Sequence, residues 1–280
     1  MARVAIVKGT DPPDMTIRAL EMVDAHEAIS EEKTILVKPN YINASHPSTG
    51  NTTDSRVIEG VVKFLKQHGA EEIIIGEGSG FADTFEAFRI SGVEAVAKKW
   101  NVKLVDLNKD DFIPIRSPSP LANKVKIAKT ALESTIVSVP KLKPHGQAGA
   151  TLSIKNLMGA VTPKGSMHLN LNRNIAELAS IIKPSIAVID GIVAGEGHET
   201  SGNPVEMNIV ITGKDPVAAD AVGAAVMGIL PTEVKHLRLA EQKGLGTSDL
   251  NQIEVVGEPI EGVKKKFKRS ILSSFLIHLG

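Results

Sequence analysis

The sequence predicts an α/β fold in which helices flank a mostly parallel sheet. Short runs rich in Val and Ile alternate with segments of helical periodicity along most of the 280 residues. The centres of these runs are almost free of charge, as expected for parallel strands buried on both faces. We expect one α/β domain over residues 1–260, although a chain of this length can also form two lobes. Residues 108–130 are a candidate excursion from it, and residues 261–280 are expected to form a basic, amphipathic tail.

Strands and helices alternate in the first half of the chain. Apolar runs predict strands at residues 4–8, 34–39, 72–76 and 102–107. Helical patterns are found at residues 15–29 and 55–68 and after Asp83. Asp14 and Asp54 are placed to cap the first two helices. Between residues 108 and 128 three prolines weaken the pattern, which indicates either an excursion at the sheet edge or a small subdomain.

The second half of the chain repeats this alternation. Strands are predicted at residues 134–140, 185–190, 207–212 and 253–256. Helices are predicted at residues 174–183, 216–227 and 231–243. The helix at residues 216–227 has Asp215 as its cap and Pro216 at its first position. Asp220 stands alone among Ala and Val in that helix, either as a buried acid bonded to a nearby loop or as a catalytic group.

Basic and polar side chains follow the strand at residues 134–140. Lys141, Lys143 and His145 come directly after it, and Lys155 and Asn156 lie in the apolar segment that follows. In open α/β sheets the carboxyl ends of the strands are where ligands bind. Ammonium groups, an imidazole and an amide suit a carboxylate or phosphate, so this stretch predicts an anion site.

A second strand end carries the same chemistry. Lys38 and Asn40 leave the strand at residues 34–39 as Lys141 and Lys143 leave theirs, which favours a shared site. Each of these residues also has a plain structural explanation. The loop lysines can be solvated, Lys38 can extend from the end of a buried strand, and Asn156 can satisfy a buried backbone group.

A glycine-rich turn, Gly76-Glu-Gly-Ser-Gly80, follows the strand at residues 72–76. Such a turn before a helix either cradles a phosphate through its N–H groups or packs tightly beneath a site. Its spacing is not that of a dinucleotide fingerprint, and no P-loop Lys-Ser/Thr pair follows. We include Gly76 and Gly78 among the candidate ligand-binding residues.

A second polar loop follows the strand at residues 185–190. Asp190, Glu196, His198 and Glu199 offer oxygen and nitrogen ligands to a divalent cation, and the glycines between them let the loop fold around an ion. Acidic, glycine-rich loops are also common simply because they are solvated. A divalent metal is therefore one hypothesis for this loop.

Composition excludes several classes of function. The chain has no cysteine, so it has no disulfide, thiolate nucleophile or cysteine-ligated iron–sulfur cluster. Net charge is zero and aromatic residues make up only 3%, which argues against nucleic acid as a partner. No apolar run approaches the roughly 20 residues of a transmembrane helix, and the first residues read as a strand rather than a signal peptide. We expect a cytoplasmic protein.

Several motifs occur in a fixed order between about Lys38 and Gly228. They are Val37-Lys-Pro-Asn40, Gly76-x-Gly78, Val139-Pro-Lys-Leu-Lys-Pro-His145, Ile154-Lys-Asn-Leu-Met-Gly159, His168, Val188-Ile-Asp-Gly191 and Asp215-Pro-Val-Ala-Ala-Asp220. This set resembles the family called domain of unknown function 362. The resemblance implies an α/β fold and no assigned general activity.

Departures from that family also carry information. Many of its members carry ferredoxin-type cysteine runs, which this chain lacks. Where members tend to have a Gly-Pro-rich turn after Asp-Gly, this chain has Gly195-Glu-Gly-His-Glu199. A fainter similarity to the nucleotide-cofactor lactate racemase group implies chemistry on a small hydroxy acid.

The leading hypothesis is an enzyme that binds a small carboxylated or phosphorylated metabolite. His145, His168 or Lys155 would move a proton, because a histidine titrates near neutral pH and a desolvated lysine can act as a base. The alternative is a non-catalytic ligand-binding protein, or an accessory subunit whose redox partner supplies the clusters. The tail, Lys264–Arg269 and the apolar residues after it, either docks on the domain or meets an anionic membrane or a partner protein. The oligomeric state does not follow from the sequence.

Overall fold

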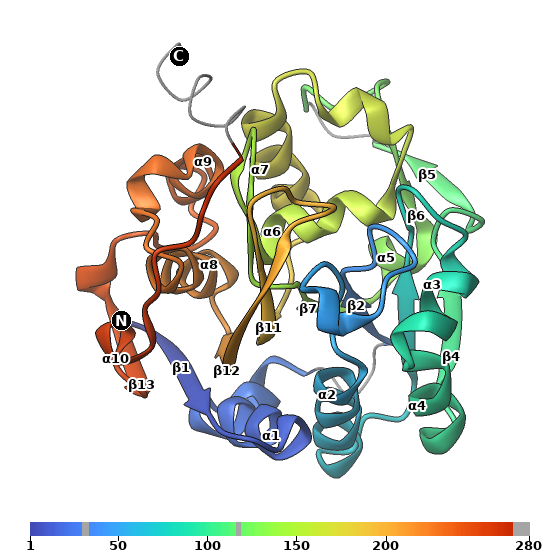
Figure 1. The fold of residues 1–280 in the computed structure, drawn as a ribbon. Coiled ribbons are helices and arrows are strands. Elements are labelled where there is room, and N and C mark those ends of the chain that lie inside the picture. Colours follow the sequence, from blue (N-terminus) through green and yellow to red (C-terminus); the bar gives the residue numbers. More distant parts are fainter. Residues whose placement is uncertain (30–33, 116–118, 271–280) are drawn as a thin grey trace.

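A large sheet runs through the centre of the molecule (Figure 1). The computed structural model describes residues 1–29, 34–115 and 119–270. Within these ranges the sheet has eight strands in the order β13-β1-β12-β11-β7-β2-β3-β4. Their bounds are β1 (Ala2–Lys8), β2 (Ile35–Pro39), β3 (Ile73–Glu77), β4 (Lys103–Asp106), β7 (Thr135–Val139), β11 (Ile186–Glu196), β12 (Asn203–Gly213) and β13 (Ile253–Gly257).

The sheet is mostly parallel, which confirms the predicted fold class. β12 runs antiparallel to β1 and β11, and the other neighbouring strands pair in parallel. The connection between β11 and β12 spans only residues 197–202, and so short a connection joins antiparallel strands. The predicted strand at residues 185–190 therefore continues to Glu196, and Asp190 lies inside β11 rather than at its end.

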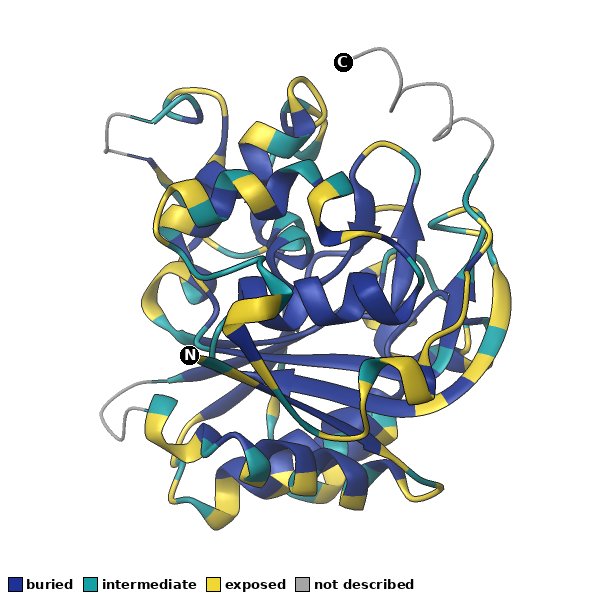
Figure 2. Cartoon of the chain, turned by 90° about the vertical axis from the view of Figure 1, so that its left-hand side faces the viewer, coloured by how far each residue is buried: buried dark blue, intermediate teal, exposed yellow. Residues whose placement is uncertain are grey.

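Helices cover both faces of this sheet (Figure 2). One layer contains α1 (Pro12–Met22), α2 (Ser55–Gln67), α3 (Thr84–Ser91) and α4 (Val93–Trp100). The other layer contains α6 (Ser153–Asn156), α7 (Leu171–Ile181), α8 (Pro216–Val226) and α9 (Lys235–Gln242). Alternate residues of β2 serve the two layers: Ile35 and Val37 join one apolar core and Leu36 joins the other.

Aspartates begin several helices, and one prediction of this kind is wrong. Asp54 caps α2, Asp83 caps α3 and Asp215 caps α8, each through its side-chain oxygen. In α1 the cap is Asp11 and not Asp14, whose own N–H is the donor to Asp11. That helix also ends at Met22 because Asp24 adopts a left-handed φ of 51°, after which Ala25–Ala28 form a separate turn.

Two small sheets accompany the main one. Residues 108–130 supply β5 (Phe112–Pro114) and β6 (Lys126–Ala128), which pair with each other and lead into α5 (Lys129–Glu133). The other edge of β6 pairs with β10 (Val161–Thr162). Ile127 and Val161 belong to the same apolar core as the α8 face of the main sheet. The second small sheet is a hairpin of β8 (Lys143–His145) and β9 (Gly149–Thr151), a stretch that the sequence indicated only as a loop.

The first part of the tail lies against the domain. After α10 (Ile260–Val263), the Lys268 N–H donates to Glu196 over 2.9 Å and the Arg269 guanidinium donates to Glu233 over 2.7 Å. The apolar tail positions from Ile271 onward lie outside the described residues. Among the helices that the structure describes, none is long and apolar enough to cross a membrane.

Candidate functional site

A cavity of about 430 Å³ lies beside the carboxyl ends of β2 and β3 and beside the β8–β9 hairpin. It is lined by many of the residues singled out in the sequence: Asn40, Gly78, Lys143, His145, Lys155, Asn156, His168 and His198. They come from segments far apart in the chain, because the parallel strands all end at the same sheet edge. Lys38, Lys141, Gly76, Asp190 and Glu196 do not line this cavity.

Lys38 lies beneath the cavity in a buried ion pair. Its ammonium is 2.7 Å from the Glu77 carboxylate, and both side chains are almost fully buried. Burial lowers the pKa of Lys38, and the Glu77 charge opposes that shift. Gly159 lies directly above the pair, where a Cβ would overlap the Glu77 carboxylate and the Lys38 ammonium. Lys38 therefore stabilises the cavity floor, with Glu77 as a partner that sequence reasoning did not assign.

The orientation of the Asn156 amide follows from its neighbours. Its NH₂ group donates to the carbonyls of Lys38 (3.0 Å) and Pro39 (3.2 Å), so its oxygen faces the other way. That oxygen accepts from the Asn40 amide over 3.2 Å. Both asparagines line the cavity, yet Asn156 also satisfies backbone carbonyls at the end of β2, the role that the sequence left open.

Lys141 forms a second buried pair, with Asp190. The ammonium and the carboxylate are 2.6 Å apart and both side chains are fully buried. The same carboxylate accepts from the N–H groups of Asp54 (2.7 Å) and Ile192 (2.9 Å). Asp190 thus neutralises Lys141 and fixes three chain segments, which leaves neither group facing the cavity.

His145 is held in one tautomer by the hairpin turn. Its Nδ1 accepts from the N–H groups of Gln147 (3.2 Å) and Ala148 (3.1 Å), so its proton is on Nε2. Nε2 is 3.6 Å from a Glu199 carboxylate oxygen. Burial lowers the pKa of His145, and the charge of Lys155 lowers it further. His145 is therefore a neutral donor, a poor match to the role of general base.

Lys143 is buried, and no carboxylate in the part of the chain that the structure describes forms an ion pair with it. Its ammonium donates to the Asn51 carbonyl over 2.7 Å. Burial lowers the pKa of Lys143 to about 7, with the charges of Lys155 and Lys141 acting in the same direction. Lys143 therefore loses its proton closer to neutral pH than an ordinary surface lysine does.

Lys155 lies on the single turn of α6, and its neighbours are anchored on both sides. The N–H groups of Ser153 and Ile154 donate to the buried Asp220 carboxylate over 2.7 and 3.0 Å. Asn156 on the other side is bonded to β2. Asp220 is therefore a buried acid that fixes a backbone turn, and burial raises its pKa to about 8. Burial also lowers the pKa of Lys155 to about 8, although the Glu199 charge opposes this.

Besides Glu77, two charged residues that line the cavity, Lys164 and Glu199, lay outside the proposed anion site. Lys164 lines the cavity, contacts the Asn108 amide oxygen and has its pKa lowered by burial. Glu199 accepts from the Gly146 N–H over 3.3 Å and faces His145. The segment after Met158 and the loop between β11 and β12 bring them to the cavity. No sequence pattern marked Lys164, and the sequence indicated Glu199 only as a possible metal ligand.

The glycine-rich turn does not present a set of free donors. The Gly78 N–H donates to the Glu77 side chain (2.7 Å), the Ser79 N–H to Thr84 (3.3 Å) and the Gly80 N–H to the Ile42 carbonyl (3.2 Å). Gly76 lies inside β3, where a Cβ would press on Leu36. The geometry therefore favours the tight-turn interpretation over the phosphate cradle.

The proposed metal ligands are dispersed. Asp190 is paired with Lys141, and Glu196 accepts from the Lys268 backbone. His198 lines the cavity mouth, and its Nδ1 accepts from the Thr200 N–H over 3.3 Å. Across residues 1–29, 34–115 and 119–270, no group of three or more His, Asp or Glu side chains is placed to hold a metal ion.

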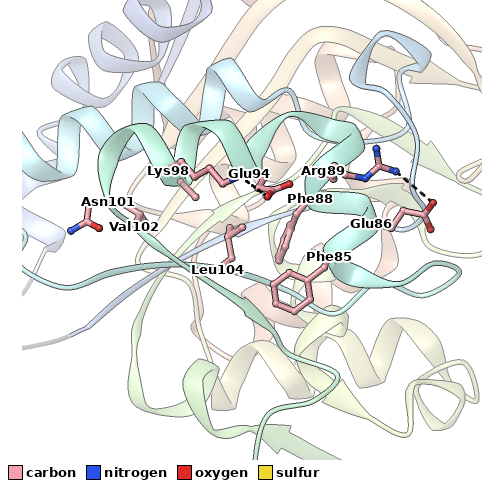
Figure 3. Close-up of a pocket in the computed structure, with 10 residues that line it drawn as sticks. Phe85, Glu86, Phe88, Arg89, Glu94, Lys98, Asn101, Val102 and Leu104 are labelled. Atoms are coloured by element: carbon pink, nitrogen blue, oxygen red, sulfur yellow. Dashed lines mark ion pairs between the residues drawn. The ribbon is translucent and has the colours of Figure 1, made fainter.

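A wider hollow lies on the outer surface of α3, α4 and β4 (Figure 3). Its charged residues neutralise each other, because Glu86 pairs with Arg89 (4.0 Å) and Glu94 with Lys98 (3.0 Å). The remaining wall is formed by apolar side chains such as Phe85 and Leu104. Each charged side chain that lines this hollow thus has an ion-pair partner within it, so the smaller cavity is the better candidate site.

Comparison with known proteins agrees with the motif order. A family model described as domain of unknown function (DUF362) matches residues 35–225. The chain belongs to this family. The DUF362 match includes both strand ends and the Lys155 turn, so the cavity is built largely from the part of the chain that defines the family.

Two individual proteins are also similar to this DUF362 chain. A thylakoid-associated protein of Synechocystis sp. is 23% identical over 245 residues, covering 84% of this chain and 75% of the relative. The lactate racemase apoprotein of Thermoanaerobacterium thermosaccharolyticum matches with a TM-score of 0.51 at 18% identity. That match covers 82% of this chain and only 57% of the racemase, and at this identity it supports the fold alone.

Proposed function

We propose that the cavity binds a small carboxylated or phosphorylated metabolite and that the protein is an enzyme acting on it. The observation that carries this proposal is an imbalance of charge. Around the described cavity and its floor, Lys38, Lys143, Lys155 and Lys164 face two carboxylates, Glu77 and Glu199. Glu77 is already paired with Lys38, so a bound anion would supply the missing negative charge.

The same groups can move a proton. With pKa values of about 7 and 8, Lys143 and Lys155 exchange protons near neutral pH, where a base is most effective. His145 presents Nε2–H to a ligand as a donor. His168 lies exposed at the cavity mouth and is the second candidate for proton transfer.

A screen for ligands tests this proposal. Thermal melting is measured with a panel of carboxylated and phosphorylated metabolites, since a ligand at 100 times its Kd adds roughly 2.7 kcal/mol to stability. We expect one group of anions to stabilise the wild type and to lose this effect in Lys143→Ala and Lys155→Ala. Lys66→Ala, on the exposed side of α2, is the matched control and keeps the effect.

The outcomes separate the alternatives. If no anion binds, or if the cavity variants bind as well as Lys66→Ala, the anion site is overturned. Binding without turnover would favour a ligand-binding protein or the accessory subunit of a redox system. Cell fractionation tests the expected cytoplasmic location. The membrane fraction is the one to compare, because the Synechocystis relative is called a thylakoid-associated protein.

A further inference from the structure

One lysine at this sheet edge differs from its neighbours. Lys38 pairs with Glu77, Lys141 pairs with Asp190, Lys143 donates to Asn51 and Lys164 contacts Asn108. The Lys155 amine has no hydrogen bond or ion pair to any residue in the described part of the chain, and its side chain lines the cavity. It is therefore the amine that is most available to a ligand.

Hydrogen bonds to buried groups hold the backbone on both sides of Lys155. Asp220 holds the two N–H groups before it, and Asn156 holds the end of β2 after it. All three anchoring partners, Asp220, Ser153 and Asn156, are buried. A reactive group that must meet a ligand in one geometry needs this kind of support.

We propose that Lys155 is a nucleophile that forms an imine with an aldehyde or ketone carbonyl of the bound anion. This inference rests on the proposed function, because the anion must first occupy the cavity. The neutral amine adds to the carbonyl carbon, and a carbinolamine forms. The carbonyl oxygen then leaves as water with both hydrogens of the amine, and a carbon–nitrogen double bond replaces the carbon–oxygen double bond.

The surroundings of Lys155 suit each part of this step. Burial favours the neutral amine, which is the form that attacks a carbonyl. Lys143 is placed to meet the anionic group, since its side chain lines the same cavity as Lys155. Glu199 and the His145 Nε2–H lie together at the same wall, where the Glu199 carboxylate can take up and return a proton during loss of water and His145 can donate a hydrogen bond to the departing oxygen.

Borohydride trapping tests the proposal on the full chain. The protein is incubated with glyoxylate, pyruvate or 2-oxoglutarate, reduced with sodium borohydride and examined by mass spectrometry. We expect an adduct whose mass is that of the oxo acid minus one water plus two hydrogens, located on Lys155. Lactate, which has a carboxylate but no aldehyde or ketone group, should leave no adduct.

Variants assign the adduct to one amine. Lys155→Met should lose it and Lys66→Met should keep it, with circular dichroism and melting temperature showing that both variants are folded. Lys143→Met should still be trapped at a high concentration of the oxo acid. It should need a higher oxo-acid concentration for half-maximal labelling, because the substitution removes a binding group and leaves the nucleophile.

Each contrary result has its own meaning. Absence of a Lys155 adduct with all three oxo acids overturns the nucleophile, and so does equal labelling of Lys155→Met and the wild type. If anions still stabilise the wild type through Lys143 and Lys155 in the melting screen, the proposed function survives that result. If no anion binds in the screen, both proposals fail.

Discussion

The lysines at the carboxyl edge of the sheet fall into two groups with opposite surroundings. Lys38 and Lys141 are buried against carboxylates at 2.7 and 2.6 Å. Lys143 and Lys155 line the cavity and form no ion pair with a carboxylate among the described residues. Burial lowers their pKa values to about 7 and 8. The difference teaches that residue type and strand position do not define a binding lysine; the partner carboxylate decides between a structural and a reactive ammonium group.

The two groups also depend on each other. A neutralised floor keeps the strand ends together without adding positive charge to the cavity, because Glu77 and Asp190 each cancel one ammonium. Lys143 and Lys155 can then respond to the charge of a bound ligand. Three changes, in decreasing order of expected effect, test this division.

The largest effect should come from the floor. Asp190→Asn leaves the fully buried Lys141 charge without its partner, and we expect the free energy of unfolding to fall by about 3–5 kcal/mol. Urea unfolding followed by circular dichroism measures this. The double variant Lys141→Met/Asp190→Asn should recover most of the loss, because it removes the orphaned charge. If Asp190→Asn were as stable as the wild type, Lys141 would not depend on its carboxylate partner, and the division between floor lysines and cavity lysines would be wrong.

A smaller, pH-dependent effect should come from Lys143. Below pH 7 this lysine is charged in both the folded and the unfolded state, so the folded state carries the full cost of its burial. Above about pH 7 the folded state releases the proton, whereas the unfolded lysine retains it until about pH 10.5. The stability of the wild type relative to Lys143→Met should therefore rise with pH across that window.

Urea unfolding of both proteins at several pH values on either side of 7 measures this difference. Lys66→Met, compared with the wild type over the same range, is the control and should show no such rise, since its side chain is exposed on α2. A constant difference between wild type and Lys143→Met would show that Lys143 keeps its proton in the folded state and belongs with the floor lysines.

The smallest effect should come from a surface pair. Glu94 and Lys98 are 3.0 Å apart on the exposed side of α4, beside the outer hollow. Glu94→Gln should change stability by only about 0.3–0.5 kcal/mol, and less at high salt, because water screens the pair. Thermal melting at low and high salt checks this. If Glu94→Gln lost as much stability as Asp190→Asn, burial could not be the reason why the two ion pairs contribute differently to stability.

Much of the fold could be predicted from local patterns. The uncharged runs that became β2, β3 and β7, and the aspartates that cap α2, α3 and α8, act through interactions between residues close in sequence. The gathering of Lys143, Lys155, His145 and Asn156 around one cavity also agrees with the sequence, because parallel strands place their ends at one edge. Family membership followed from the same motif order.

The sequence by itself therefore determined the fold class, the absence of cysteine chemistry and the sheet edge at which the polar residues meet. Only the tertiary structure decided which lysine has a partner. Glu77 and Lys38 are 39 residues apart, and Asp190 and Lys141 are 49 apart, so no local spacing reveals either pair. Electrostatic energy depends on distance and burial in three dimensions, and these lower the pKa of Lys155 and leave its amine without a hydrogen bond or ion pair to the described residues.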